Sequence, residues 1–409
     1  MDLLNQEEIN TIIKQYGSFK VLDFSISKYS DVFIGSLGDH FKLIVTVDDS
    51  VQSKYKFFVK CMPKNQWVAE YLTKSNYFRR EYTMLRELFV EFDRNGGSKW
   101  RPRSVFVKEN VFVFEDAREL GYQMAGESQG GILSYKEMQA AVIALARFHA
   151  RSLIYEEKKS QELHRPYRIW EDFSELLQQS PDHDWRNTGR NAVIEFLKVY
   201  SKRKNEPDFS KNVTELLISL FDDALNLMKP SAKYRNTVIH RDLWCNNILI
   251  KSDNENDHAL IVDFQTVLYG APTLDLSSLI YFNTTKHFRD IYLHEMLEIY
   301  YEELSNEVKR ELNIIFSTIL SKDTFMESYE ECVLFGMTQA AILVPITAMK
   351  VEKKEELYST PESGHRINNV SRSKEIIDVA NEDATYCSRI TELFEDIVDR
   401  YYNVKREVN

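Results

Sequence analysis

The stretch 238-VIHRDLWCNNILI-250 places polar side chains between two short runs of β-branched apolar residues. These apolar runs predict two buried strands, so Asp242 and Asn247 occupy the loop that connects them. A second acidic residue, Asp263, follows the apolar run in 258-HALIVDF-264. Because a loop held between strands is a rigid mount for functional side chains, this region is the first candidate for chemistry.

The order Asp242, Asn247, Asp263 matches the arrangement used for phosphoryl transfer. A carboxylate within hydrogen-bond reach of an acceptor hydroxyl orients it and accepts its proton. Mg²⁺ that bridges ATP phosphates prefers hard oxygen ligands, such as an Asn carbonyl and an Asp carboxylate. We therefore expect Asp242 to be the catalytic base, and Asn247 and Asp263 to hold the metal. An ordinary turn is the alternative for Asp242 and Asn247.

Two upstream residues are candidates for binding the nucleotide phosphates. Lys60 ends the predicted strand YKFFVK, and Glu81 lies on or beside the apolar stripe of the predicted helix FRREYTMLRELFVEF. A carboxylate that faces the interior needs a cationic partner, for which Lys60 is the obvious choice. In kinases such a Lys contacts the α- and β-phosphates while the helix Glu orients it. Glu87 on the same helix is the alternative to Glu81.

The remaining nucleotide contacts are expected from backbone groups. Gly35 and Gly38 in 34-IGSLGDHF-41 predict a turn that covers the phosphates, because Gly lets backbone N–H groups approach closely. An ordinary hairpin is the alternative. Glu115 and Ala117 lie where a predicted hairpin ends and the helical part begins, so we expect a hinge there that offers backbone groups to adenine.

Four other residues near these motifs are expected to be structural. Asp275 caps the following helix or braces the catalytic loop. His149 lies on the apolar face of the helix AAVIALARFHA, where a lone His is usually a hydrogen-bonded core residue. Trp244 packs under the loop, and Cys245 is an inert small residue.

At these motifs the chain resembles a known family. HRDLWCNN with IVDFQ, followed by 270-GAPTLDLSSL-279, is similar to the ecdysteroid kinase-like (choline/ethanolamine-kinase-like, CHK) branch of the aminoglycoside phosphotransferase superfamily. The resemblance extends from about Phe24 to Ile280. It includes the family's phosphate loop, strand Lys, helix Glu, hinge and a helix motif, at GDHF, FFVK, FRRE, FEDA and LARFHA. Two residues depart from the family pattern: Arg241 replaces a Gly, and His40 replaces an Asn.

This resemblance implies an α+β, bilobal protein-kinase-like fold with a small β-rich N-terminal lobe and a larger, mainly α C-terminal lobe. Strand patterns before the hinge and helical patterns after it agree. We expect an ATP-binding lobe at residues 1–115, a hinge at 116–122, and a catalytic and substrate-binding lobe at 123–409. The implied reaction is transfer of the γ-phosphate to a small-molecule hydroxyl, with ATP and Mg²⁺ as cofactors.

Two other functions remain open. Arg241 creates the His-Arg-Asp of protein kinases, but only eleven residues separate Asp263 from Asp275, and no Ala-Pro-Glu follows. Gln265 also stands where protein kinases carry the Gly of Asp-Phe-Gly, so an activation loop has little room. A catalytically silent ATP- or ligand-binding module is the third hypothesis, and the complete set of catalytic residues disfavours it.

The acceptor is expected to be a small alcohol. Aromatic and apolar residues at helical spacing follow Tyr281, and they suit a lipophilic alcohol such as a steroid, although core packing explains most of them. These residues are Phe282, Phe288, Tyr292, Met296, Tyr300, Phe325, Phe335 and Met337. An ecdysteroid is the acceptor that the resemblance suggests.

Composition limits the partners and the compartment. A net charge of −11 disfavours nonspecific binding to nucleic acid or to an anionic membrane. Four scattered cysteines fit free thiols in a reducing compartment, and the acidic N-terminus does not fit a signal peptide, so we expect a cytoplasmic protein. We also expect a monomer or weak dimer. The apolar segment 333–349 predicts a buried helix and no membrane insertion. Segment 353–374, rich in charge, Ser, Pro and Gly, predicts poor order.

Overall fold

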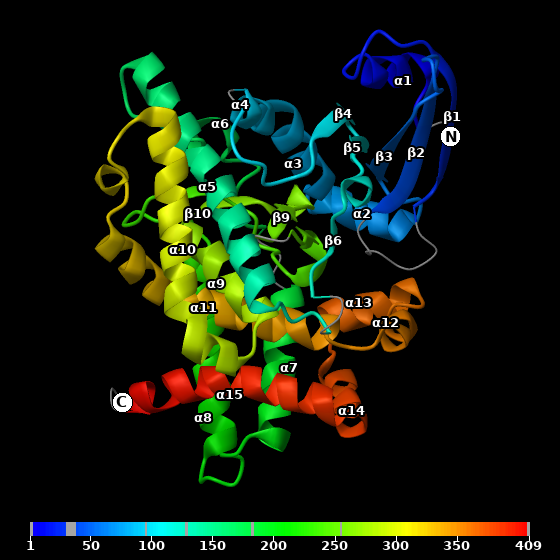
Figure 1. Cartoon of the computed structure of the whole chain (residues 1–409). Coiled ribbons are helices and arrows are strands. Elements are labelled where there is room, and N and C mark those ends of the chain that lie inside the picture. The colour runs from blue at the N-terminus through cyan, green and yellow to red at the C-terminus, as the bar shows by residue number, and fades with distance from the viewer. Residues whose placement is uncertain are drawn as a thin grey trace.

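A computed structural model describes residues 3–29, 38–94, 96–126, 130–180, 184–253 and 256–406. An antiparallel sheet with a few helices forms the N-terminal part, and a mainly helical part follows it (Figure 1). The sheet lies at one end of the molecule, and the last long helix crosses the opposite end. The α+β architecture predicted from the sequence is confirmed.

The N-terminal sheet has the strand order β1-β2-β3-β5-β4, and all of its neighbouring strands are antiparallel. Its strands are β1 Val21–Lys28, β2 Asp39–Val47, β3 Lys54–Cys61, β4 Ser104–Lys108 and β5 Val111–Glu115. Alternate residues of β2 and β3 point into a core that helix α1 (Gln6–Ile13) covers with Ile9, Ile12 and Ile13. The predicted hairpin turn at residues 109–110 lies between β4 and β5.

One helical rod joins this sheet to the rest of the molecule. It contains α3 Tyr77–Thr83, a π-helical turn at Met84–Leu88 and α4 Phe89–Asp93, and α2 Gln66–Lys74 precedes it. The apolar stripe predicted a continuous helix, whereas the structure inserts the wider π turn. The sequence pattern therefore located the rod but not its change of helical pitch.

The C-terminal part consists of helices packed around two small sheets. After the 3₁₀ turn Ala117–Leu120, β6 Gln123–Met124 pairs with β8 Ile248–Lys251, which pairs with β9 His258–Ile261, while β7 Thr237–Ile239 pairs with β10 Leu268–Gly270. Further 3₁₀ turns are Cys245–Asn247 after β7, Phe264–Thr266 after β9, and Phe316–Thr318. The helices are α5 Tyr135–Leu163, α6 Trp170–Phe173, α7 Asp184–Tyr200, α8 Phe209–Leu227, α9 Pro272–Asn283, α10 Lys286–Leu312, α11 Lys322–Thr347, α12 Val351–Leu357, α13 Pro361–Asn369, α14 Ser373–Glu382 and α15 Ala384–Arg406.

Helix α11 contains the apolar segment 333–349 that predicted a buried helix. Within the described residues it is the one helix long and apolar enough to cross a membrane, with a mean hydropathy of 1.2 over a window that is 67% buried. It packs closely on α9, since a Cβ atom on Gly336 would lie 2.6 Å from the Ser277 carbonyl carbon. This burial confirms the prediction of a core helix.

The prediction of poor order over 353–374 is wrong. This segment lies in α12, α13 and the start of α14. The Thr, Pro and Ser that resemble loop signals form the start of α13, where Thr360 and Ser363 make a reciprocal capping box and Pro361 occupies the first turn. Buried Leu357 and Ile367 anchor the segment to the fold.

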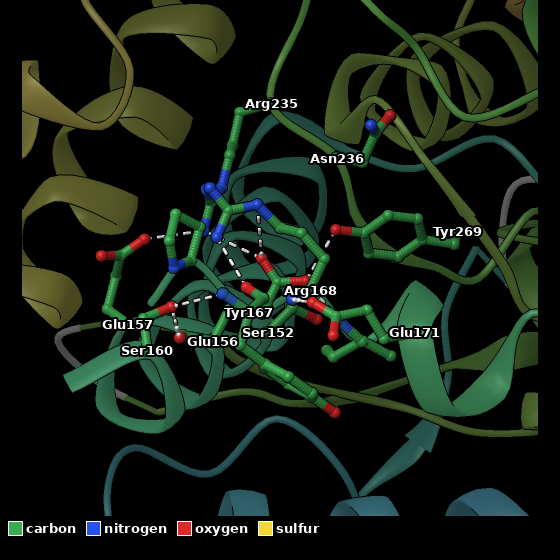
Figure 2. A network of polar contacts seen from close by, with 12 residues as sticks. Ser152, Glu156, Glu157, Ser160, Tyr167, Arg168, Glu171, Arg235, Asn236 and Tyr269 are labelled. Carbon is green, nitrogen blue, oxygen red and sulfur yellow. Dashed lines mark hydrogen bonds and ion pairs between the residues drawn. The ribbon is translucent and has the colours of Figure 1, made fainter. Parts of the chain in front are cut away.

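A fully buried carboxylate ties α5 to three other segments, as Figure 2 shows. Glu156 Oε1 accepts hydrogen bonds from Tyr269 Oη at 2.6 Å and from Ile169 N at 2.9 Å. Its Oε2 accepts one from Arg235 Nη2 at 2.8 Å, and Arg235 also pairs with Glu157. Burial raises the pKa of Glu156, while the Arg235 charge opposes that rise. The network fixes β7 and β10, which flank the catalytic loop, against α5.

We expect Glu156→Ala to lower the free energy of unfolding by about 3 kcal/mol, because Arg235 and the Ile169 N–H lose a buried acceptor. Urea denaturation measures this loss. Glu162→Ala, at an exposed position of the same helix, is the control and should change stability by less than about 0.5 kcal/mol. A loss below about 1 kcal/mol for Glu156→Ala would contradict the structural importance of the network.

Candidate active site

Lys60 lies at the centre of a buried charge cluster that joins the two parts of the chain. Strand alternation points it away from Phe57 and Val59, which lie in the sheet core, and toward the C-terminal part. Its Nζ lies 2.6 Å from Glu81 Oε2 and 2.8 Å from Asp263 Oδ1. The predicted pairing of Lys60 with Glu81 is confirmed, and Glu87 is not needed as the alternative.

Lys60 and Asp263 hold each other in the ionised state. Burial by itself would lower the pKa of Lys60, but the charges of Asp263 and Glu81 outweigh it and raise that pKa. Burial also favours a neutral Asp263, but the Lys60 charge outweighs it and lowers the pKa of Asp263. For Glu81, burial prevails and raises the pKa, while Lys60 opposes it. The two carboxyl groups thus share one ammonium, and the pKa shifts place the ionic pair between Lys60 and Asp263.

Asp242 and Asn247 face each other across the catalytic loop. Asn247 Nδ2 donates to Asp242 O at 2.8 Å and to Asp242 Oδ2 at 3.0 Å. Both amide hydrogens are thus used, and no bond to Asn247 Oδ1 occurs among the described residues. That oxygen and the Asp263 carboxylate are the donor types that Mg²⁺ prefers. The described part of the chain contains no group of three or more His, Cys, Asp or Glu side chains suited to a metal, so phosphate or water oxygens would complete the coordination.

The environment of Asp242 suits a general base. Burial and the nearby charge of Asp263 raise its pKa to about 7, while Arg241 and the hydrogen bond from Asn247 moderate this rise. A carboxylate with a pKa close to neutral pH can accept a proton and still be largely ionised.

His240 holds the start of the catalytic loop as a neutral imidazole. Its Nε2 lies 2.9 Å from Val262 O, so Nε2 carries the proton. Its Nδ1 then accepts from Asp242 N at 3.2 Å. Burial lowers the pKa of His240, which agrees with this neutral form. The imidazole thereby links the base to the strand that leads to Asp263.

The departure at Arg241 has a backbone consequence. Arg241 adopts a φ of +73°, which is in the left-handed region that favours Gly, the residue usual in the family at this position. Asp275 secures this conformation, since its Oδ1 accepts from Arg241 N at 2.7 Å and its Oδ2 accepts from His240 N at 2.5 Å. Asp275 therefore braces the loop, while the start of α9 at Pro272 has Ala271 as its cap residue.

His149 supports this brace from within the core. It is fully buried, with Nε2 3.1 Å from Asp275 Oδ2 and Nδ1 2.6 Å from Tyr300 Oη. The prediction that His149 is a hydrogen-bonded core residue is confirmed.

The predicted phosphate cover is described only at its end. Gly35 lies outside the described residues. A Cβ atom on Gly38 would lie 3.4 Å from Lys60 Cε and 3.5 Å from His40 Nε2, so the chain passes close to the Lys60 side chain. His40 lies opposite Lys60 in the β2-β3 register, and burial followed by the Lys60 charge lowers its pKa to about 4. Phosphate binding by both glycines stays a prediction.

The predicted hinge residues lie at the connection between the two parts. Glu115 ends β5, and Ala117 begins the 3₁₀ turn that follows. Between them, Asp116 Oδ1 accepts from Arg118 N at 3.1 Å and from Tyr29 Oη at 2.7 Å. The Tyr29 bond ties the end of β1 to this connection. Adenine binding there, and the lobe boundaries at 116–122, stay predictions.

Most of the aromatic and apolar residues considered for the acceptor wall lie in the core, as the core-packing alternative expects. Phe282, Met296, Tyr300, Phe325, Phe335 and Met337 are all buried, because α9, α10 and α11 pack on one another and on α5. Exposed aromatic surface lies on α2, where the ring centroids of Trp67 and Tyr71 are 6.4 Å apart in a stacked arrangement and Tyr71 is 38% exposed. Helix α13 faces them, since a Cβ atom on Gly364 would lie 3.8 Å from the Trp67 ring.

One residue with a role at the site was missed by sequence reasoning. Arg80 is buried beside Glu81, and its guanidinium donates to Leu176 O at 2.6 Å and Gln265 O at 3.2 Å. It thus joins the helix that carries Glu81 to the segment after Asp263. The available signal was its position next to Glu81, near the inward face of the helix.

Asp242→Asn should stabilise the protein while removing the base. The pKa of Asp242 rises from 3.8 to about 7 on folding, so the wild type loses stability as the pH rises through that range. We expect the variant to have the higher Tm at pH 8, with a smaller difference at pH 5, in calorimetry without divalent metal. A lower Tm for the variant at pH 8 would contradict this account of the carboxylate.

A pair of substitutions at residue 241 isolates the backbone strain. Arg241→Ala and Arg241→Gly both remove the bond from the Arg241 side chain to Gln179, but only Ala retains the cost of a positive φ. We expect the Gly variant to be more stable than the Ala variant by about 1 kcal/mol in urea denaturation. Equal stabilities, or a more stable Ala variant, would show that the loop relaxes to another backbone conformation.

Comparison with known proteins identifies the family of this chain. Residues 38–313 match the Ecdysteroid kinase-like family. No curated protein matches. Among solved structures, the microcompartment-associated aminopropanol kinase aligns with 12% identity and a TM-score of 0.37, over 88% of this chain and 97% of that chain. Because the family match covers more than half of the sequence, the chain belongs to the ecdysteroid kinase-like family of small-molecule kinases and has its kinase-like α+β fold.

Proposed function

We propose that this protein transfers the γ-phosphate of Mg-ATP to a hydroxyl group of a lipophilic alcohol, with a steroid-like acceptor such as an ecdysteroid as the leading candidate. The carrying observation is the meeting of Lys60, Glu81 and Asp263 in one cluster, while Asp242 and Asn247 face each other on the loop before Asp263. Each of the first three comes from a different segment, so a merely local turn does not account for their meeting.

The residues divide the reaction between them. Lys60, held by Glu81, would bind the phosphates, with Gly35, Gly38 and the backbone at Glu115 and Ala117 as further nucleotide contacts. Asp242 would orient the acceptor hydroxyl for in-line attack on the γ-phosphorus and accept its proton as the new O–P bond forms.

A divalent cation fits the donor set near the catalytic loop. Asn247 Oδ1 and the Asp263 carboxylate would hold Mg²⁺, which would supply charge neutralisation at the phosphates. The chain's own part is to hold the Asp263 carboxylate against Lys60 and to fix Asn247 beside the segment that leads to Asp263, since Val262 N donates to Asn247 O at 3.0 Å.

A lipophilic acceptor is supported by the aromatic surface on α2. Trp67 and Tyr71 lie on the same side as α13, and Tyr71 makes an edge contact with Tyr77 at 6.0 Å. Figure 1 shows α12 and α13 below α2 on this side of the molecule. An apolar ring system stacked on Tyr71 would bury aromatic surface that is now exposed.

The protein-kinase alternative is disfavoured by the segment after Asp263. Residues 264–283 are buried without interruption and form a 3₁₀ turn, β10 and α9. A buried segment cannot serve as an exposed, phosphorylatable loop or as a peptide platform. A silent binding module is disfavoured because Asp242 is placed to act as a base.

We further propose a cytoplasmic monomer or weak dimer that binds neither nucleic acid nor membranes. The four cysteines, Cys61, Cys245, Cys332 and Cys387, are free, which fits a reducing compartment. The burial of α11 supports the absence of membrane insertion.

Transfer of labelled γ-phosphate from Mg-ATP to a sterol and small-metabolite extract tests the proposed function. We expect label in an organic-extractable small molecule, with at least about a hundredfold loss for Asp242→Asn and for Asp263→Ala. Asp222→Asn, on the exposed face of α8, is the matched control and should retain activity.

Label on protein alone would favour the protein-kinase alternative. Substantial turnover by a folded Asp263→Ala variant would contradict the metal assignment. ATP binding without any transfer would favour the silent module.

A further inference from the structure

Five cationic residues around the catalytic loop lack an acidic partner. Although the chain has 63 acidic and only 52 basic residues, none of the five forms an ion pair among the described residues. All are buried or half-buried: Arg186, Arg241, Lys354, Arg372 and Arg389. Cations at such positions normally pair with carboxylates, so this set of five points to an external anion.

Two of these cations lie on the side of the loop that faces α7. Arg241 precedes the catalytic base, and its guanidinium bonds to the neutral side chain of Gln179. Arg186 Nη1 donates to the neutral Gln339 Oε1 at 2.7 Å, and its buried Nη2 has no partner among the described residues. Burial, followed by the charge of Arg241, lowers the pKa of Arg186 to about 10, as expected of neighbouring like charges.

Arg372 adds a further positive charge behind α7. It lies 5.0 Å from the Trp185 ring and donates from Nη2 to Ile342 O at 3.0 Å, while its Nε and Nη1 have no partner. The absence of a side chain at Gly189 makes room for this guanidinium. Because Arg372 is completely buried, its charge is only weakly screened by water.

Two more cations approach the other end of the loop at Cys245. Arg389 Nη1 donates to Gly130 O at 2.8 Å, and the next residue lies against Cys245, since a Cβ atom on Gly131 would lie 3.2 Å from Cys245 Sγ. Burial raises the pKa of the Cys245 thiol, while the charges of Arg389 and Lys354 oppose that rise. Within the described part of the chain, Arg389 donates only to main-chain carbonyls, and Lys354 Nζ donates to Thr347 O at 3.3 Å. The charge of Glu392 acts on Arg389, but the described residues show no ion pair between them, and Glu392 accepts from Lys286 N at 2.7 Å.

We propose that the acceptor is an alcohol that carries an anionic oxygen group, a carboxylate or a sulfate ester, on an apolar frame. This inference rests on the proposed function, because it assigns the cations to the acceptor side of the site. The hydroxyl lies at Asp242, the apolar frame lies against Trp67 and Tyr71, and the anion lies at Lys354 and Arg389. Arg186, Arg241 and Arg372 add positive charge on the side of the loop that faces α7.

Binding of a probe pair tests the inference without any need for turnover. 8-Anilinonaphthalene-1-sulfonate and N-phenyl-1-naphthylamine differ only in the sulfonate group. With saturating Mg-ADP in the nucleotide site, we expect the sulfonate to bind the wild-type chain at least about tenfold more tightly in fluorescence titrations. Lys354→Met and Arg389→Met should each remove most of that preference. Lys211→Met, an exposed cation on α8, is the matched control and should retain it.

Equal affinities for the two probes would overturn the inference, as would no sulfonate binding. A preference for the sulfonate that survives in both Lys354→Met and Arg389→Met would also overturn it. Circular dichroism confirms that each variant is folded. A second arm compares phosphorylation of a hydroxysteroid carboxylate with that of its methyl ester. Faster turnover of the carboxylate, lost in the two variants with an unchanged KM for ATP, supports the inference.

Failure of the inference and failure of the proposed function give different results. Asp242-dependent phosphorylation of the methyl ester, with charge substitutions that change nothing, would retain the kinase and reject the anionic acceptor. Charge-dependent sulfonate binding without phosphotransfer to either steroid, or to the extract, would retain the anion site and reject the kinase activity.

Discussion

The pairing of Lys60 with Glu81 and Asp263 is the interaction on which the rest of the structure depends. Charges removed from water are costly unless each finds a partner, so β3, α3 and the turn after β9 must meet at one point. Arg80 reinforces this meeting, because it holds main-chain carbonyls from two segments of the C-terminal part. The two parts of the chain are therefore joined by polar contacts at the site itself.

The catalytic loop is held in a backbone conformation that it would not adopt alone. Arg241 and Asp263 both have positive φ angles, at +73° and +69°, and such strain persists only where the surroundings over-determine it. Asp275, supported by buried His149, supplies that constraint through the main-chain N–H groups at the start of the loop. Packing in the core thus helps to keep Asp242, the proposed base, in position.

One wrong prediction in the C-terminal part, and one alternative that the sequence left open, have physical causes. Thr360, Pro361 and Ser363 are residue types typical of loops, but the same types also begin helices. Only the structure of the residues that follow shows whether a loop or a helix forms. The aromatic residues after Tyr281 have the spacing of a helix face, but spacing does not say whether that face meets a ligand or another helix. Most of these residues are buried among α9, α10 and α11, so they pack against other helices.

The sequence by itself determined the chemistry and the local elements of this protein. Alternation placed Lys60 on a strand, the apolar stripe turned Glu81 inward, and the need of a buried carboxylate for a cation predicted their pairing. The tertiary structure alone decided which distant residues meet, such as Lys60 with Asp263, 203 positions apart, and which cations remain without carboxylates. The reason is that periodicity reports only which face of an element is buried, whereas the partner across that face depends on the packing of the whole chain.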